Sequence, residues 1–406
     1  MSEALRPATE WELQGIVGTC AEKRTPIEIV GGGSKRAIGR PVRAGVTVST
    51  GSLSGISLYE PTELVMSART GTLLSQVEVE LAGRGQMLAF EPVDLGPVLG
   101  TRGGAQTIGA VFSGNLSGSR RVSAGAARDH LLGVRGVNGR AEAFKSGGRV
   151  MKNVTGYDVS RAVAGSWGTL AVLTEVTFKV LPVPETAATL VYPGLPDDLA
   201  VEVMCGAMAS PFEVSSAAHL PEALAARLPD EKLSQPGKPM TMLRIENFAK
   251  SVAYRTGALQ KLLRVYGPPF QLDYAETQRL WSELRRLAVF PFGPTTLWRI
   301  STAPKTAPKL VGAIKRHMPA EAFYDWSGGL VWLEVQATSD AGAADIRRVV
   351  ALHGGHATLI RAEENVRAAV EVFQPLAPGL ERLTRGLKAA FDPLGLLNPG
   401  RMYAGV

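Results

Sequence analysis

Residues 103–118 read GGAQTIGAVFSGNLSG, with five glycines among small hydroxyl and amide side chains, no charged residue and one aromatic ring. Such a run buries too little apolar surface to form an ordinary core segment. Glycine allows the backbone to approach another group closely and to adopt positive φ, at an entropic cost. A chain that concentrates this cost in one segment typically surrounds a ligand with main-chain N–H groups.

A second glycine-rich loop follows a short predicted strand at residues 26–30, and its residues 31–36 read GGGSKR. A glycine-rich turn at the end of a strand is a position where consecutive amides bind phosphate. The loop is neither the dinucleotide fingerprint G-x-G-x-x-G nor the P-loop, because both require glycine where Arg36 stands. Alone it would more often be a tight turn, but together with residues 103–118 it indicates a ligand site.

The totals describe a soluble globular protein. A chain of 406 residues is too long for one ordinary core, which predicts two domains, and 45% hydrophobic with 20% charged residues is ordinary globular composition. No apolar run approaches the roughly 20 residues needed to cross a bilayer. The N-terminus lacks the pattern of a signal peptide, so we expect a cytoplasmic protein with no transmembrane segment.

The charge balance and the cysteine content limit the ligands, partners and metal sites that we expect. Lys and Arg (44) exceed Asp and Glu (37), which favours an anionic ligand or an acidic partner surface. No dense basic block is interleaved with aromatic residues, so we expect no nucleic-acid partner. The two cysteines, Cys20 and Cys205, lie far apart and predict neither a disulfide framework nor a metal site.

Hydrophobic periodicity predicts the elements around the two loops. We expect a helix at about 8–24, a helix capped by Thr72 and ending near Ala82, a hairpin about Asn138-Gly139, and a short helix capped by Asp158. Residues 186–375 alternate predicted strands with predicted helices and lack a phosphate loop, which favours an antiparallel sheet with helices on one side. The strands are expected at 188–192, 240–245, 297–301, 330–336 and 357–360. The helices are expected at 196–209, 252–266, 274–287, 304–318 and 340–353.

Several of these motifs resemble the FAD domain of the vanillyl-alcohol oxidase superfamily, and in particular the FAD-binding subunits of bacterial glycolate oxidases. The resemblance covers about the first 185 residues and the last 15, in family order. The matching segments are 31–36, Tyr59-Glu60-Pro61, Gly85-Gln86, Thr107-Ile108-Gly109, 115–118, 150–158, 165–170 and 391–402.

The resemblance implies an α+β fold with a two-part FAD-binding domain at 1–185, an α+β cap with an antiparallel sheet at 186–375, and a C-terminal helix and tail at 376–406 that return to the flavin. FAD is expected to be non-covalent, because the first loop has no histidine where some relatives attach the flavin. In relatives a backbone group near the position of Val172 touches the adenine, and the tail lies near the edge of the isoalloxazine ring. The cofactor-binding residues expected are Gly31, Gly32, Gly33, Ser34, Lys35, Arg36, Thr107, Ile108, Gly109, Ser113, Gly114, Asn115, Gly118, Asp158, Gly168, Val172, Asn398 and Arg401.

The implied activity is oxidation of a small 2-hydroxy acid, glycolate, to glyoxylate. The resemblance implies partner subunits, a second flavin subunit and an iron–sulfur subunit, with peripheral attachment at the inner membrane through them. A self-sufficient FAD-dependent dehydrogenase or oxidase of another alcohol or hydroxy acid is the alternative, and a scaffold protein with a degenerate flavin site is a third possibility, disfavoured by the intact loops.

The cap shows no obvious chemistry of its own. Related hydroxy-acid dehydrogenases carry a His-x-His metal cluster, whereas the nearest pair here is His353 and His356, so no metal is expected. Polar residues stand beside the predicted cap strands, but each of them alone reads as a surface charge, and no catalytic residue is assigned. These residues are Arg299, Asp325, Arg361, Glu363 and Glu364.

Overall fold

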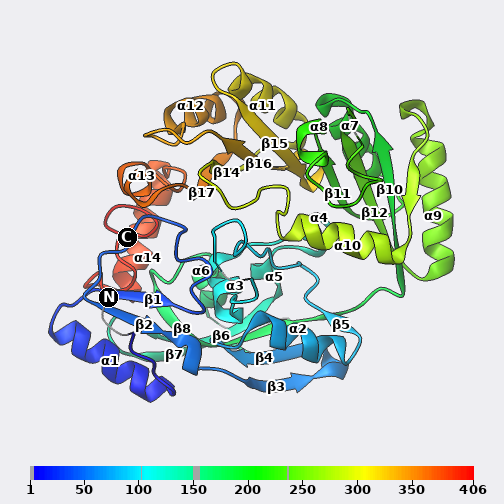
Figure 1. The fold of residues 1–406 in the computed structure, drawn as a ribbon. Helices are drawn as coiled ribbons and strands as arrows, with labels where there is room; N and C mark the ends of the chain where they lie inside the picture. Colours follow the sequence, from blue (N-terminus) through cyan, green and yellow to red (C-terminus); the bar gives the residue numbers. More distant parts are fainter. Residues whose placement is uncertain (1–3, 102, 150–155, 236) are drawn as a thin grey trace. The chain divides into compact units, whose positions relative to one another are not determined.

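A computed structural model describes residues 4–101, 103–149, 156–235 and 237–406. The chain divides into two compact units (Figure 1). The first unit comprises Met1–Ser117, Gly125–Pro182 and Glu371–Val406, and the second comprises Gly118–Ala124 and Val183–Val370. Gly118–Ala124 thus clusters with the second unit, although the sequence predicts one continuous domain over 1–185. Residues 150–155, part of the resemblance, lie outside the described residues.

The first unit is built on a five-stranded antiparallel sheet in the order β3-β4-β8-β6-β7 (Figure 1). Its strands are β3 (Ile56–Glu60), β4 (Val65–Arg69), β6 (Leu131–Asn138), β7 (Ala143–Gly147) and β8 (Ala171–Lys179). A parallel pair, β1 (Ile27–Val30) and β2 (Val46–Ser49), and an antiparallel pair, β5 (Gln86–Met87) and β9 (Leu181–Pro182), complete the strands. The helices are α1 (Glu10–Glu22), α2 (Leu74–Ala82), α3 (Ile108–Gly114), α5 (Ala127–His130), α6 (Val159–Val163) and α14 (Pro378–Phe391).

Two apolar clusters hold this unit together. The larger packs Val77 and Leu81 of α2 and Phe112 of α3 against β4 and β8, where Met66 lies opposite Phe178. The smaller packs one face of α1 against β1, β2 and the C-terminal segment, through residues that include Leu13, Val17, Ile27, Val48 and Leu397. Burial of one apolar stripe per helix is the main source of stability in such layers.

The predicted local signals are mostly confirmed. Asp158 caps α6 by accepting a hydrogen bond from the Arg161 N–H at 3.0 Å. The Asn138-Gly139 hairpin forms between β6 and β7, with a turn in which Asn138 Oδ1 accepts from the backbone N–H groups of Arg140 and Glu142. The predicted Thr72 cap is wrong. Leu73 is the residue before α2, because Thr72 Oγ1 instead donates to the Arg69 carbonyl and accepts from the Gly55 N–H.

The second unit is one eight-stranded antiparallel sheet in the order β13-β10-β12-β11-β15-β16-β14-β17 (Figure 1). Its strands are β10 (Thr186–Pro193), β11 (Val214–Leu220), β12 (Met240–Asn247), β13 (Phe270–Leu272), β14 (Thr296–Ser301), β15 (Ala320–Asp325), β16 (Leu330–Val335) and β17 (His356–Arg361). Its helices are α4 (Arg121–Ala124), α7 (Asp197–Met208), α8 (Glu222–Ala225), α9 (Ala249–Leu262), α10 (Tyr274–Arg285), α11 (Ala307–Lys315), α12 (Ala343–His353) and α13 (Glu364–Ala369).

The predicted α+β class with an antiparallel cap sheet is confirmed. Five strands and five helices of the second unit lie where periodicity places them. Strands β11, β13 and β15 are missed, because Ser-Ser-Ala-Ala in β11 and Ala-Glu-Ala in β15 lack a strong apolar alternation and β13 has only three residues.

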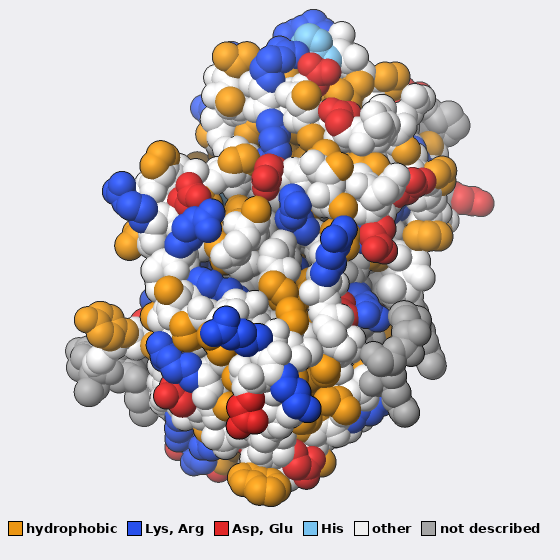
Figure 2. All heavy atoms as spheres, turned by 90° about the vertical axis from the view of Figure 1, so that its left-hand side faces the viewer, with side chains coloured by type: hydrophobic (Ala, Val, Ile, Leu, Met, Phe, Trp, Pro, Cys, Tyr) orange, Lys and Arg blue, Asp and Glu red, His pale blue; other side chains and the backbone are white. Residues whose placement is uncertain are grey.

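Two surface properties complete the description. Across the described helices, none combines the length and the apolar character that a bilayer span requires. Figure 2 shows one face on which Lys and Arg side chains are spread among uncharged, hydrophobic and acidic ones rather than gathered into a single patch.

Candidate functional site

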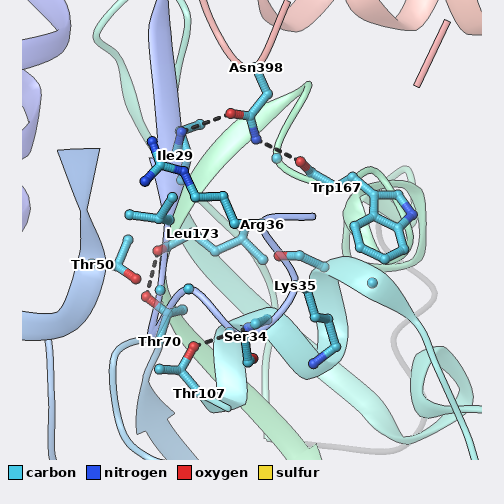
Figure 3. A pocket seen from close by; sticks show the side chains of 18 of the residues that line it. Ile29, Ser34, Lys35, Arg36, Thr50, Thr70, Thr107, Trp167, Leu173 and Asn398 are labelled. Carbon is cyan, nitrogen blue, oxygen red and sulfur yellow. Dashed lines mark hydrogen bonds between the residues drawn. The ribbon is translucent and has the colours of Figure 1, made fainter. Parts of the chain in front are cut away.

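A cavity of about 80 Å³ opens within the first unit, where both glycine-rich loops meet β1, β8 and the C-terminal segment (Figure 3). Twelve of the predicted cofactor-binding residues line it: Gly31, Gly33, Ser34, Lys35, Arg36, Thr107, Gly109, Ser113, Gly114, Gly168, Asn398 and Arg401. Segments that are nearly 370 residues apart in sequence therefore form one wall.

The two glycine-rich loops approach each other through their backbones. A Cβ atom on Gly31 would lie 2.4 Å from Thr107 Oγ1, and one on Gly32 would lie 1.8 Å from the Ala105 carbonyl oxygen. Real Cβ contacts are never this short, so side chains are excluded where the loops meet. Gly33 adopts φ of +77°, which places the next residues of the loop along the cavity.

Helix α3 starts at the cavity and packs directly on the end of β4. Thr107 caps it by accepting from the Ala110 N–H, and the Gly109 N–H donates to the Thr70 carbonyl at 3.0 Å. A Cβ on Gly109 would lie 2.5 Å from Thr70 Cβ. Thr70 Oγ1 in turn donates to the Leu173 carbonyl at 2.6 Å, which ties β4 to β8 behind the helix (Figure 3).

Lys35 is the cavity residue with the most unusual electrostatics. Its side chain is 6% exposed, and its Nζ has no hydrogen-bond partner within the described part of the chain. Burial lowers the pKa of the ammonium group from 10.5 to about 7, against the opposing influence of Asp94. A buried cation without a partner is costly, so this position suits an anionic group bound beside it.

We expect the burial of Lys35 to be visible in the pH dependence of the FAD-free protein. The folded pKa lies below the unfolded value, so the unfolded chain binds more protons between about pH 7 and pH 10.5, and stability must rise with pH across that window. Lys35→Met removes this contribution. The free energy of unfolding of the wild type, measured by denaturant titration, should therefore rise relative to that of Lys35→Met from pH 7 to pH 10.5. Replacing the exposed Lys23 by methionine is the control, and parallel profiles for wild type and Lys35→Met would contradict the assignment.

The two arginines of the cavity are already engaged by protein groups. Arg36 forms a two-pronged ion pair with Glu28 of β1, and Arg401 Nη2 donates to the Lys35 carbonyl at 2.9 Å. The Arg401 guanidinium also lies 5.8 Å from the centre of the Trp167 ring. Both arginines add positive potential, while their hydrogen bonds position the first loop.

Asn398 joins the C-terminal segment to the cavity. Its Oδ1 accepts from the Ile29 N–H and its Nδ2 donates to the Trp167 carbonyl, each at 2.7 Å (Figure 3). Its backbone is left-handed, with φ of +41°. The segment before it is fixed by Lys388, whose buried Nζ donates to Asp392 Oδ2 and to the carbonyls of Thr169 and Leu397.

Six predicted cofactor residues lie outside the cavity lining: Gly32, Ile108, Asn115, Gly118, Asp158 and Val172. Ile108 and Val172 are fully buried in the two apolar clusters, and Gly32 packs on Ala105. Asn115 accepts from the Arg128 N–H and Asp158 caps α6, so both side chains have local structural partners. Gly118 belongs to the second unit, where its carbonyl accepts from Trp326 Nε1.

The sequence analysis missed eight lining residues: Ile29, Val30, Thr50, Thr70, Ala110, Trp167, Ala171 and Leu173. The sequence could have indicated Thr70 as a lining residue, because Thr70-Gly71-Thr72 places small hydroxyl residues at the end of a predicted strand. The apolar members look like ordinary strand residues and carry no local signal.

The cavity suits a flat, partly apolar ligand with a phosphate group. Apolar strand residues form one side, while glycine backbone, hydroxyl groups and Lys35 form the other. No His, Cys or Tyr is among the described residues that line it. The donor set fits FAD, whose pyrophosphate is bound by backbone N–H groups and cations and whose ring system packs on apolar surface.

Elsewhere in the described residues, no group of three or more His, Cys, Asp and Glu side chains could hold a metal ion.

Comparison with known proteins supports this interpretation. Residues 2–147 match the family model of the FAD binding domain. The chain is 35% identical to glycolate oxidase subunit GlcE of Escherichia coli (strain K12), over 96% of this chain and 95% of that protein. It is 25% identical to glycolate oxidase subunit GlcD of Bacillus subtilis (strain 168), over 98% of this chain and 88% of that protein.

Solved structures show the same fold at lower identity. A structure of p-cresol methylhydroxylase with substrate bound matches with a TM-score of 0.72 at 15% identity, over 98% of this chain and 88% of that one. The 4-ethylphenol oxidase from Gulosibacter chungangensis matches with a TM-score of 0.74 at 14% identity, over 99% and 89%. The predicted fold class and the predicted cofactor, FAD, are confirmed.

Proposed function

Because the chain belongs to the family of glycolate oxidase subunit GlcE, a family of FAD-linked oxidoreductases, we propose that it is the FAD-binding subunit of a multi-subunit glycolate oxidase. The observation that carries this proposal is the 35% identity over 96% of this chain and 95% of that protein. The substrate is glycolate, which loses two electrons and two protons to give glyoxylate.

FAD, when bound, supplies the two-electron acceptor for this oxidation. The residues of this chain hold it. The backbones of Gly31, Gly33 and Ser34 and of the start of α3 would bind the pyrophosphate, Lys35 would supply positive charge, and Asn398 keeps the C-terminal segment against the cavity wall. The cofactor is bound non-covalently, which is supported by the lack of His, Cys and Tyr among the described lining residues.

The electrons leave to partner subunits, a second flavin subunit and an iron–sulfur subunit. Two cysteines cannot supply the four thiolates of an iron–sulfur cluster, so such a cluster comes from another chain. The similarity to a GlcD subunit supports a second, related flavin subunit. The protein is cytoplasmic and is attached peripherally to the inner membrane by those partners.

The test is anaerobic reduction of the FAD-loaded chain by glycolate, first alone and then with its partner subunits. We expect bleaching of the flavin absorbance by glycolate, with steady turnover of a dye acceptor only in the complex. Steady turnover by the chain alone would favour a self-sufficient dehydrogenase. Bleaching by a different alcohol and not by glycolate would contradict the substrate, and flavin that stays in the pellet after acid precipitation would contradict non-covalent binding.

A further inference from the structure

Two arginines of the second unit lie against one tryptophan, and a histidine lies within electrostatic reach of both arginines. Arg299 lies on β14, His356 begins β17 and Arg121 begins α4. The guanidinium carbon of Arg121 lies 4.6 Å from the centre of the Trp326 ring, and that of Arg299 lies 5.2 Å from it. Arg299 also lies 6.0 Å from the centre of the Trp332 ring. These cation–π contacts help to position both guanidinium groups.

The sheet register places this cluster on the face away from α12. Arg299 pairs with Trp332 on β16 and with Thr358 on β17, and His356 pairs with Ser301. Since side chains alternate along a strand, Arg299 and His356 point to the same face. The preceding residue on β14, Trp298, points to the opposite face, where the guanidinium carbon of Arg347 of α12 lies 5.2 Å from the centre of its ring.

The charges of the cluster are not balanced. Several buried arginines of this unit have carboxylate partners: Arg120 and Arg244 pair with Glu246, and Arg361 pairs with Glu334. Neither Arg121 nor Arg299 forms an ion pair with a described residue. The carboxylate near them, Asp325, is 4% exposed and accepts from Ser119 Oγ and from the Trp326 N–H.

Desolvation and repulsion between the basic groups both lower their pKa values. Burial, and then the neighbouring Arg121, lowers the pKa of the Arg299 guanidinium to about 10, against the influence of Asp325. Burial, Arg299 and Arg121 likewise lower the pKa of the His356 imidazole. Holding groups of like charge close together costs electrostatic free energy, and a bound anion would offset that cost.

The backbone at the tryptophan is also strained. Trp326 and Ser327 have φ of +52° and +59°, a left-handed conformation that side chains rarely adopt. The Trp326 ring is fixed by the hydrogen bond from its Nε1 to the Gly118 carbonyl at 2.9 Å. Consecutive left-handed non-glycine residues concentrate at functional sites, where the surrounding structure maintains the strain.

We propose that Arg121, Arg299 and His356 form a binding site for a small carboxylate within the second unit, and that its ligand is the carboxylate of the 2-hydroxy acid substrate. The choice of this ligand rests on the function proposed above. A planar guanidinium presents two parallel N–H groups to a carboxylate, and two of them with an imidazole fit one small anion.

The test is equilibrium binding of oxalate, which resembles glycolate but has no C–H bond to oxidise, to the FAD-loaded protein by titration calorimetry. Arg299→Gln and Arg121→Gln should each weaken oxalate binding at least about tenfold, since each removes charged hydrogen bonds. Arg348→Gln, which breaks a surface ion pair with Asp345 on α12 and a hydrogen bond with His317, should leave the affinity unchanged. FAD content should be equal in all variants, and oxalate should raise the pKa of His356 measured by NMR.

Unchanged oxalate affinity in Arg299→Gln and Arg121→Gln would overturn the proposed site. If sulfate competed as well as a carboxylate does, the proposed preference for carboxylate would be wrong. Arg121 is exposed, so Arg121→Gln still tests the site if Arg299→Gln folds poorly. Arg299-dependent oxalate binding together with a flavin that glycolate does not reduce would support the carboxylate site and contradict the proposed oxidation of glycolate.

Discussion

Replacing Gly32 by alanine is expected to remove FAD from the protein. The new Cβ would lie 1.8 Å from the Ala105 carbonyl oxygen, so one of the two glycine-rich loops must move by more than an ångström. Neither side of this contact is the end of a flexible side chain that can rotate away. Because both loops line the cavity, a loss of about 3 kcal/mol, roughly 100-fold in FAD affinity, is expected from overpacking at this point.

The measurement is the flavin released by acid from the purified variant and its affinity after reconstitution. Gly103→Ala is the matched control, because it adds the same methyl group to the same glycine-rich segment with no described heavy atom within 4 Å. FAD affinity equal to that of the wild type in Gly32→Ala would show that the approach of the loops does not shape the cofactor site.

The second large effect is expected from Asn398→Leu. Leucine leaves the Ile29 N–H and the Trp167 carbonyl buried without their partners, and it must adopt the left-handed backbone of this position. Together these changes should destabilise the protein by about 2–5 kcal/mol. FAD affinity should fall as well, because Ile29, Trp167 and Asn398 all line the cavity.

Thermal unfolding with and without added FAD measures both consequences. Gln76→Ala on the exposed side of α2 is the control for loss of an amide in the same unit. A variant Asn398→Leu that unfolds at the wild-type temperature and retains its FAD would show that the C-terminal segment is not part of the site.

The sequence by itself predicted twelve of the residues that line the cavity of the first unit. Residues 31–36 and 103–118 are local patterns of glycine and small polar residues, and their backbone freedom is a property of the residues themselves. The strands and helices of the second unit were also predictable, since periodicity records which side of each element is buried. The missed strands β11 and β15 lie inside the sheet, where pairing with neighbours on both sides compensates for weak patterning.

Tertiary structure alone decided which residues meet. Nothing local to Lys35 indicates that its ammonium group is buried without a partner, because burial depends on the packing of residues distant in sequence. The same holds for Arg299, which reads as an isolated surface charge until the fold of the second unit brings it and Arg121 against Trp326. Local patterns encode backbone conformation, whereas the energy of a charge depends on neighbours that only the folded chain supplies.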